Sequence, residues 1–450
     1  MSSPTRDHDR TAAKRSLQSG TIGAIVEWYE YTIYGTTAAL VFGTLFFPQF
    51  DPGVGQIAAL ASFGVGFLAR PVGAVVAGHL GDRIGRKSTL ILTFSVMTVA
   101  TALIGLLPTY HQIGLAAPIL LCLLRLAQGF AVGGEWGGAA IIAVESAPRN
   151  RRGYFGSWPQ IGVSAGLLLG SAAIAVATAI SGDGFTEWGW RIPFLMSIPL
   201  TAVGFFIRLR ALESPAFLAE KARREAVAEE QKAPLVVLVR EHRRALLIAI
   251  FGRFAEAGNY YLFTTFALSY VTASLGVSRG VGLVASMIGA AANIAMIPVY
   301  GRLSDAIGRP RTFLIGGACI VATAAPIFLL LQTGRTWAII VGILLFMGLG
   351  HAMVYAQLPA LYCELFPTAV RYSGISVGYQ MAAILLSSFT PVLASTLLLW
   401  SGGSVWPVIL FAIGTTVIAM IAVSFAPDRR EVDLDDIAVP AHVTREAARG

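Results

Sequence analysis

Residues 78–87 read GHLGDRIGRK, and residues 301–310 repeat this phrase as GRLSDAIGRP. The second copy begins about half of the 450-residue chain after the first. Each copy is a short polar segment with an acid, bases and glycines, placed between long apolar stretches. Duplicated helical halves are typical of proteins that move solutes across membranes. The repeat therefore predicts two related helical bundles embedded in a bilayer.

The composition is that of a membrane protein. Hydrophobic residues make up 55% of the chain and charged residues only 13%, and the mean hydropathy is +0.69. The apolar stretches are about 20 residues long, which suits helices that cross a bilayer, and they lack the ~10-residue alternating segments of barrel strands. Because lipid offers the backbone no hydrogen bonds, we predict an all-α membrane protein.

The apolar stretches predict twelve transmembrane helices in two pseudo-symmetric bundles of six. Their approximate ranges are 20–46, 56–80, 88–107, 115–143, 155–179, 190–208, 246–272, 281–300, 312–332, 337–362, 372–398 and 405–425. The predicted domains are an N-terminal tail (1–19), a first bundle (20–208), a linker (209–245), a second bundle (246–425) and a C-terminal tail (426–450). The linker is rich in alanine and alternating charges, so we expect an amphipathic helix there.

Lys and Arg are distributed unevenly between the two sides of the predicted bilayer. Those inside spans are Arg70, Arg125 and Arg253, and those in loops opposite the termini are Arg191, Arg279 and Arg335. All others lie with the termini, which predicts that both termini are cytoplasmic in a multi-pass protein of the cytoplasmic (inner) membrane. The net charge of +8 then reflects this bias and anionic lipid headgroups, and we expect no nucleic-acid partner. We interpret the polar start of the chain as a retained tail and not a signal peptide.

The sequence offers no pattern of an enzyme. No P-loop, HExxH or nucleophile-elbow motif occurs in the predicted cytoplasmic segments, so we expect no catalytic activity and no cofactor beyond the proton gradient. The cysteines Cys122, Cys319 and Cys363 lie in or beside apolar spans, which indicates neither disulfides nor a metal site. We expect a monomer.

Further motifs accompany the repeated phrase. They are EWYEY at 27–31, GFAVGGEWGGA at 129–139, WGWRIPF at 188–194 and ESP at 213–215. The loop phrase resembles the signature of the major facilitator superfamily, and the motifs together resemble its metabolite:proton symporter family. Members of that family carry shikimate, dicarboxylates, citrate, or proline and betaine. The family commonly has aspartates in its first span, whereas this chain has Glu27 and Glu30.

Charged side chains inside the predicted spans are the first candidates for chemistry. A charge at a helix centre costs about 2.5–3.5 kcal/mol to insert, so such residues are usually functional. Glu27 and Glu30 lie one turn apart on the first span, as do Arg125 and Gln128 on the fourth. Arg253, Glu256 and Asn259 follow one face of the seventh span. We expect these three faces to border a common central cavity.

Roles follow from the chemistry of these groups. An arginine binds a carboxylate with paired hydrogen bonds, and a buried carboxylate exchanges protons near neutral pH. The predicted substrate-binding residues are Arg125, Gln128, Arg253, Asn259, Tyr260, Gln380 and Trp28. The predicted proton-coupling residues are Glu27, Glu30, Glu135 and Glu256. The alternative is structural ion pairing, for example of Glu30 with Arg125, and His351 is either a proton relay or a hydrogen-bonded core residue.

The loop phrases predict a cytoplasmic gate. A second echo supports the duplication, because ESAP at 145–148 resembles ELFP at 364–367. We expect Asp82 and its neighbouring bases to contact the end of the fourth span, and the cluster to latch the bundles together. The gate residues are Gly78, Asp82, Arg83, Gly85, Arg86, Lys87, Glu145, Arg149, Arg152, Asp305, Arg309, Glu364 and Arg371. The alternative is that these charges only set the topology.

Together these features predict a proton-coupled symporter that takes up a small carboxylated metabolite, such as shikimate or a dicarboxylate, by alternating access. Its expected partners are that organic acid, protons and the lipid bilayer. Alternatives of the same fold are a proton symporter for zwitterionic osmolytes (proline or betaine) and a drug/proton antiporter. Buried Arg125 and Arg253 favour anions over cationic drugs. Arg70, in the second predicted span, has no assigned role.

Overall fold

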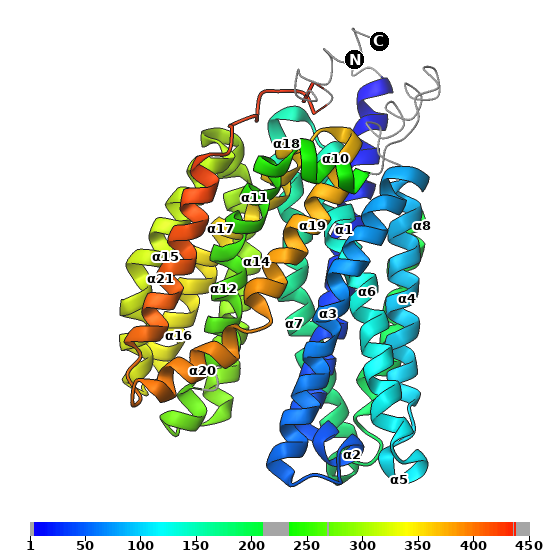
Figure 1. Cartoon of the computed structure of the whole chain (residues 1–450), viewed down its shortest axis with the longest axis vertical. Coiled ribbons are helices and arrows are strands. Elements are labelled where there is room, and N and C mark those ends of the chain that lie inside the picture. The colour runs from blue at the N-terminus through cyan, green and yellow to red at the C-terminus, as the bar shows by residue number, and fades with distance from the viewer. Residues whose placement is uncertain (1–3, 210–233, 268–269, 435, 438–450) are drawn as a thin grey trace.

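The computed structural model describes residues 4–209, 234–267, 270–434 and 436–437. Within these ranges the ordered elements are helices, and no strand occurs. Figure 1 shows two helical bundles side by side, and the first and last described residues lie at the same end of the molecule. We call this the terminal end and the opposite one the far end.

The helices of the first bundle come from the first half of the chain. They are α1 (Pro4–Thr37) with its extensions η1 (Ala38–Phe42) and α2 (Gly43–Phe46), α3 (Pro52–Ile84), α4 (Arg86–Leu106), α5 (Tyr110–Ile113), α6 (Ala116–Glu145), η2 (Arg149–Arg151), α7 (Arg152–Ser181), η3 (Gly182–Phe185) and α8 (Arg191–Leu209).

The helices of the second bundle are more often interrupted. They are α10 (Pro234–Glu241), α11 (Arg243–Gly252), α12 (Phe254–Tyr261), η4 (Leu262–Phe266), η5 (Tyr270–Ser274), α14 (Arg279–Ile307), α15 (Arg309–Gln332), α16 (Thr336–Leu345), η6 (Phe346–His351), α17 (Ala352–Ala356), α18 (Leu358–Leu365), η7 (Thr368–Val370), α19 (Arg371–Ala382), η8 (Ala383–Ser387), α20 (Thr390–Trp400) and α21 (Trp406–Ser424).

The prediction of an all-α membrane protein is confirmed. Among the described residues, nine helical stretches are long and apolar enough to cross a bilayer. The predicted first, seventh, tenth and eleventh spans contain the π-helical segments η1, η4, η6 and η8. Such breaks in membrane helices are tolerated where the backbone faces protein or a cavity. The expected linker helix falls largely on residues 210–233, which lie outside the described ranges.

Glycines allow the closest helix contact of the first bundle. Gly162, Gly166 and Gly170 are spaced one helical turn apart on α7 and pack against α1. A Cβ atom on Gly166 would lie 2.5 Å from the Cβ of Trp28 on α1. Because lipid gives helices no hydrophobic reason to associate, such backbone approach is a main source of their attraction.

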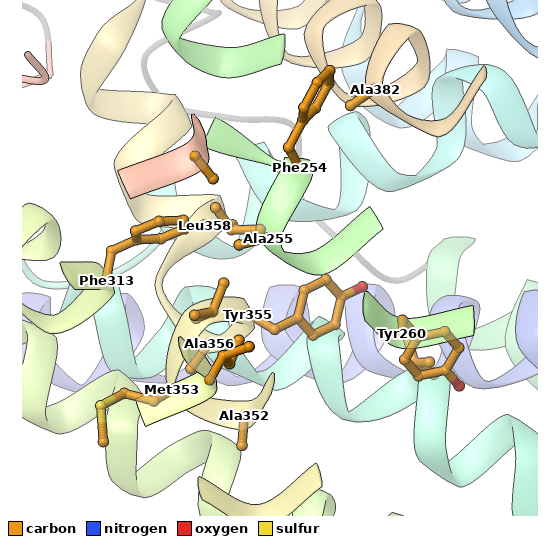
Figure 2. Packing of buried hydrophobic residues seen from close by; sticks show 14 of the residues in the cluster. Phe254, Ala255, Tyr260, Phe313, Ala352, Met353, Tyr355, Ala356, Leu358 and Ala382 are labelled. Atoms are coloured by element: carbon orange, nitrogen blue, oxygen red, sulfur yellow. The ribbon is translucent and has the colours of Figure 1, made fainter. Parts of the chain in front are cut away.

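The hydrophobic cores show how the bundles meet. Toward the far end the first bundle has its own aromatic cluster, which includes Phe42 and Trp190. Toward the terminal end one core joins both bundles and includes Trp136 from α6 and Tyr372 from α19. Figure 2 shows the part of this core formed by Phe254, Tyr260 and Tyr355 with their neighbours. The bundles thus share side-chain packing at the terminal end, and their ribbons diverge toward the far end (Figure 1).

Replacing Gly166 with valine is expected to destabilise the first bundle. The new side chain meets α1 at the position of Trp28, and overpacking of this kind costs about 1–3 kcal/mol. The thermal unfolding midpoint in detergent measures the effect. Gly64→Ala is the matched control, because a Cβ there meets nothing within 4 Å, and equal midpoints for the two variants contradict the packing account.

Candidate functional site

A narrow pocket lies between the two bundles. Its lining residues are Glu27, Trp28, Phe67, Arg70, Trp136, Arg253, Tyr261, Tyr379, Gln380, Ala383 and Ser387. The free space is about 10 Å³, which is roughly the room needed by one water molecule. Of the residues predicted from sequence to bind substrate or protons, four line this pocket: Glu27, Trp28, Arg253 and Gln380. The pocket is therefore charged and nearly closed.

Aromatic stacking closes one wall of the pocket across the bundles. The rings of Trp136 on α6 and Tyr379 on α19 are parallel to within 15°, with centroids 3.7 Å apart. The guanidinium of Arg253 lies 3.3 Å from the centre of the Tyr379 ring and donates to the Tyr379 carbonyl at 2.6 Å. Arg253 also pairs with Glu256, Nε to Oε2, at 2.8 Å. The charge of Arg253 is thus balanced locally.

Two further hydrogen-bonded bridges cross between the bundles. Gln160 on α7 accepts from the indole of Trp136 at 2.8 Å and donates to the carbonyl of Tyr355 at 3.0 Å. Ser164 donates to Asn293 on α14 at 3.1 Å. The Asn293 amide nitrogen lies 2.9 Å from Nδ1 of His351. His351 is therefore a hydrogen-bonded core residue, which was one of the two alternatives predicted for it.

Inside the first bundle, three hydrogen bonds connect a buried arginine to a buried glutamate. Arg125 donates to Gln128 at 3.0 Å, and Gln128 donates to the hydroxyl of Thr101 on α4 at 2.6 Å. The Thr101 hydroxyl donates to Oε2 of Glu30 on α1. Oε1 of Glu30 has no hydrogen-bond partner among the described residues. Thr101, which sequence reasoning missed, is the link between the two charges.

The guanidinium of Arg125 is enclosed by aromatic rings. Its Cζ lies 4.4, 4.3 and 4.7 Å from the ring centres of Tyr31, Tyr34 and Phe63, and its side chain is 1% exposed. Arg125 does not line the pocket between the bundles, contrary to the expectation of a common cavity. Helical spacing predicted which residues share a face with Arg125, but its burial depends on how α6 is rotated against α1, α3 and α4.

Other residues that the sequence predicted for the site lie elsewhere in the two bundles. Asn259 is not among the residues that line the pocket, and it donates to Thr416 on α21 at 3.0 Å. Tyr260 lies against Trp28 and His351, with ring centres 5.9 and 5.2 Å away. Glu135 is buried on α6, close enough to Glu30 for their charges to interact.

Arg70 on α3 is a pocket residue whose role sequence reasoning could not assign. Its side chain is 5% exposed, and its Cζ lies 4.6 Å from the ring centre of Tyr31 and 4.3 Å from that of Phe67. Its Nε has no hydrogen-bond partner in the described part of the chain. The feature of the sequence that could have identified Arg70 as a site residue is its charge inside an apolar span, directly before Pro71.

At the terminal end, the second loop phrase contacts the first bundle. Asp305 on α14 accepts from the backbone amides of Gly153 and Tyr154 in the first turn of α7, at 2.8 and 2.9 Å. It also pairs with Arg309 at 2.7 Å, and Arg309 pairs with Glu364 at 3.2 Å. The first amides of a helix lack partners within it and attract negative charge. This contact therefore ties α14 to α7.

A buried ion pair joins the bundles nearby. Arg371 at the start of α19 pairs with Glu145 at the end of α6 at 2.5 Å. Arg371 also donates to the carbonyls of Cys363, Phe366 and Leu434, at 3.0, 3.1 and 2.9 Å. Both side chains are fully buried. Glu145 thus pairs across the bundles, and its predicted contact with the Asp82 cluster stays a prediction, because the side chains of Asp82 and Arg86 lie outside the described part of the chain.

The segment after α21 contacts two arginines predicted to belong to the gate. Arg149 and Arg152 approach Asp433 at 3.5 and 3.6 Å, and Arg152 donates to the carbonyl of Val432 at 2.6 Å. A cavity of about 490 Å³ lies beside it, lined by Arg149, Asn150, Asp305, Ala306, Arg309, Arg430 and Glu431. The pairing of Arg149 and Arg152 predicted with Asp82 involves a side chain outside the described part of the chain and stays a prediction.

The remaining gate residues belong to the first loop phrase. The side chains of Asp82 and Arg86 lie outside the described part of the chain, Arg83 is exposed, and Lys87 is half-buried. A Cβ atom on Gly78 would lie 3.0 Å from the backbone of Ser373. Gly85 and Gly308 separate their helices in the two bundles with similar φ angles of 107° and 102°, which favour glycine. The duplication seen in the sequence is thus also a duplication of backbone shape.

Comparisons with known proteins agree with this architecture. The family model of the Major Facilitator Superfamily matches residues 20–386 and 260–445. The chain is 39% identical to the shikimate transporter of Escherichia coli (strain K12), over 93% of this chain and 95% of that protein. It is 36% identical to the proline/betaine transporter of Salmonella typhimurium, over 85% of this chain and 77% of that protein.

Solved structures show the same fold. The proton:xylose symporter XylE bound to 6-bromo-6-deoxy-D-glucose superposes with a TM-score of 0.78 at 16% identity, over 95% of this chain and 99% of that one. The inward open conformation of XylE gives a TM-score of 0.61 at 15% identity, over 94% and 98% of the two chains.

Replacing Glu145 with glutamine is expected to loosen the terminal end. Arg371 then keeps a buried charge without its acid, and breaking such a pair costs about 3–5 kcal/mol. The readout is alkylation of Cys363, which is fully buried beside this pair, in a Cys122→Ser, Cys319→Ser background. We expect the rate to rise by roughly tenfold or more.

Glu187→Gln provides the control, because Glu187 is an exposed acid in the η3–α8 loop. An unchanged rate for Glu145→Gln would show that the ion pair does not hold the two bundles together.

Proposed function

Because the chain belongs to the major facilitator superfamily, it is a multi-pass membrane transporter and not an enzyme, and we propose that it is a proton-coupled symporter for a small carboxylated metabolite. The observation that carries this proposal is the hydrogen-bonded connection from Arg125 to Glu30, next to a pocket lined by Arg70 and Arg253. It combines a candidate proton carrier with a pocket that contains arginine side chains. The proposed substrate is an organic acid, with cyclic hydroxy acids such as shikimate ahead of dicarboxylates.

Glu30 is the proposed proton carrier. Its carboxyl group is buried with one oxygen unbonded, so enclosing it as a charged carboxylate is costly and taking up a proton removes that cost. Through Thr101 and Gln128, the charge of Glu30 is connected to Arg125. Protonation of Glu30 therefore changes the surroundings of α1, α4 and α6 together.

The pocket supports an anionic substrate. Arginine forms the strongest and most directional hydrogen bonds to carboxylates, and two arginines line this pocket. A relative 39% identical to this chain is a shikimate transporter. We therefore place the substrate carboxylate in this pocket, which has to widen from its present volume to admit it.

Alternating access is the proposed mechanism, with both termini in the cytoplasm. The bundles are held together at the terminal end by Asp305 and by the Glu145–Arg371 pair, and they diverge toward the far end (Figure 1). Inward opening then requires these contacts and the Trp136–Tyr379 stack to separate.

A zwitterionic osmolyte is the second candidate substrate. The proline/betaine transporter is also similar to this chain, and the pocket contains Trp28 and Trp136. Aromatic faces attract quaternary ammonium groups such as that of betaine. The two candidates differ in net charge, so a single uptake experiment distinguishes them.

That experiment measures uptake into proteoliposomes with and without an inward proton gradient. The labelled panel is shikimate, succinate, citrate, an aromatic acid, proline and betaine. We expect gradient-driven accumulation of an acid that an uncoupler abolishes. Accumulation of proline or betaine alone supports the osmolyte candidate, and absence of any accumulation refutes symport of these classes.

Glu30→Gln is expected to separate exchange from accumulation. Glutamine keeps the size of the side chain and its contact with Thr101 but cannot carry the proton. Counterflow of labelled against unlabelled substrate should persist within about threefold, whereas gradient-driven accumulation is lost, because only net uptake needs proton release. Glu187→Gln serves as the control, and accumulation retained in Glu30→Gln removes Glu30 from the proton path.

A further inference from the structure

We infer that Arg70, and neither Arg125 nor Arg253, is the residue that holds the substrate carboxylate, and that its single uncompensated charge limits substrates to monocarboxylates. This inference rests on the proposed function and names the substrate class within it. It follows from the different surroundings of the three arginines inside the spans.

Arg125 is committed to the first bundle. Its guanidinium donates to Gln128 and is enclosed by three aromatic rings. It does not line the pocket between the bundles. Reaching a substrate there would require the guanidinium to leave Tyr31, Tyr34 and Phe63, which surround it.

Arg253 lines the pocket, but its charge is already balanced by an acid, although its Nε, like that of Arg70, makes no hydrogen bond within the described part of the chain. Glu256 lies 2.8 Å from its Nε, and the Tyr379 carbonyl lies 2.6 Å from a terminal nitrogen. A carboxylate arriving at Arg253 would compete with Glu256 for the same charge. Arg253 is better suited to fixing Tyr379 and the stacked Trp136 in the pocket wall.

Arg70 combines access to the pocket with an uncompensated charge. Within the described part of the chain, no ion pair joins it to an acid, and its Nε lacks a hydrogen-bond partner although the side chain is 5% exposed. Its close contacts are the faces of Tyr31 and Phe67. Rings over the guanidinium face leave its N–H groups, which lie in the guanidinium plane, available to a carboxylate.

The rest of the pocket suits one carboxylate and a hydroxylated body. Oε1 of Gln380 is a buried acceptor without a partner in the described chain, and it lines the same pocket. A substrate hydroxyl can donate to it. A second carboxylate would find Arg253 already paired with Glu256. Discrimination against dicarboxylates follows from the cost of enclosing an unpaired charge.

The test compares shikimate with its neutral carboxamide in counterflow, which reports binding and exchange without a proton gradient. Removing one charged hydrogen-bond partner costs roughly 10- to 100-fold in affinity. For Arg70→Gln we expect a loss of that size for shikimate and less than about a threefold change for the carboxamide. The wild-type preference for acid over amide therefore disappears. Wild-type protein should also prefer shikimate to succinate.

Two further variants keep the test decisive. Arg70→Lys retains the charge but loses the planar fork, so we expect it to keep most of the preference for acid over amide with a weaker affinity for the acid. Arg335→Gln removes an exposed arginine of the α15–α16 loop and should leave both affinities unchanged.

The outcomes separate the inference from the proposed function. If Arg70→Gln or Arg70→Lys weakens acid and amide equally, Arg70 has a structural role and the inference is overturned while symport stands. If the wild-type protein takes up succinate as well as shikimate, the limit to monocarboxylates is wrong. If it transports no acid at all, the proposed function fails, and the inference fails with it.

Discussion

A charge enclosed among apolar helices has to be balanced by an opposite charge or by hydrogen bonds, and the arrangement of this protein depends on how that constraint is met. Arg253 meets it through Glu256 on its own helix, and Arg371 through Glu145 of the other bundle. The second solution couples charge balance to the relative position of the bundles. Separating the bundles either exposes both charged groups to water or leaves them buried without a partner. The terminal end is therefore favoured either closed or open to water.

The same constraint links the proton site to the substrate site. Glu30 and Arg125 are connected by hydrogen bonds inside the first bundle, while Arg70 faces the pocket beside it. Tyr31 contacts both guanidinium groups with its ring. A change of charge at Glu30 and the arrival of an anion at Arg70 therefore act on neighbouring parts of the same packed region, which is a short path for coupling.

The internal duplication is preserved in shape more than in contacts. Gly85 and Gly308 take the same unusual backbone conformation at the ends of α3 and α14. The second loop phrase also makes a contact between the bundles, because Asp305 accepts hydrogen bonds from the first amides of α7. The segment around Asp433 also contacts Arg149 and Arg152 of the first bundle. Closure of the terminal end thus involves both halves and the chain that follows them.

The sequence by itself determined the all-helical membrane fold and the family, because hydropathy and short motifs are local properties of the chain. It also identified the rare intramembrane charges, since each is unusual wherever its helix packs. Only the tertiary structure decided which of them meet. It placed Arg125 inside a bundle and Arg70 at the pocket, and it paired Glu145 with Arg371. Helical periodicity defines which residues share a face, but the rotation of each helix against its neighbours comes from packing over the whole bundle.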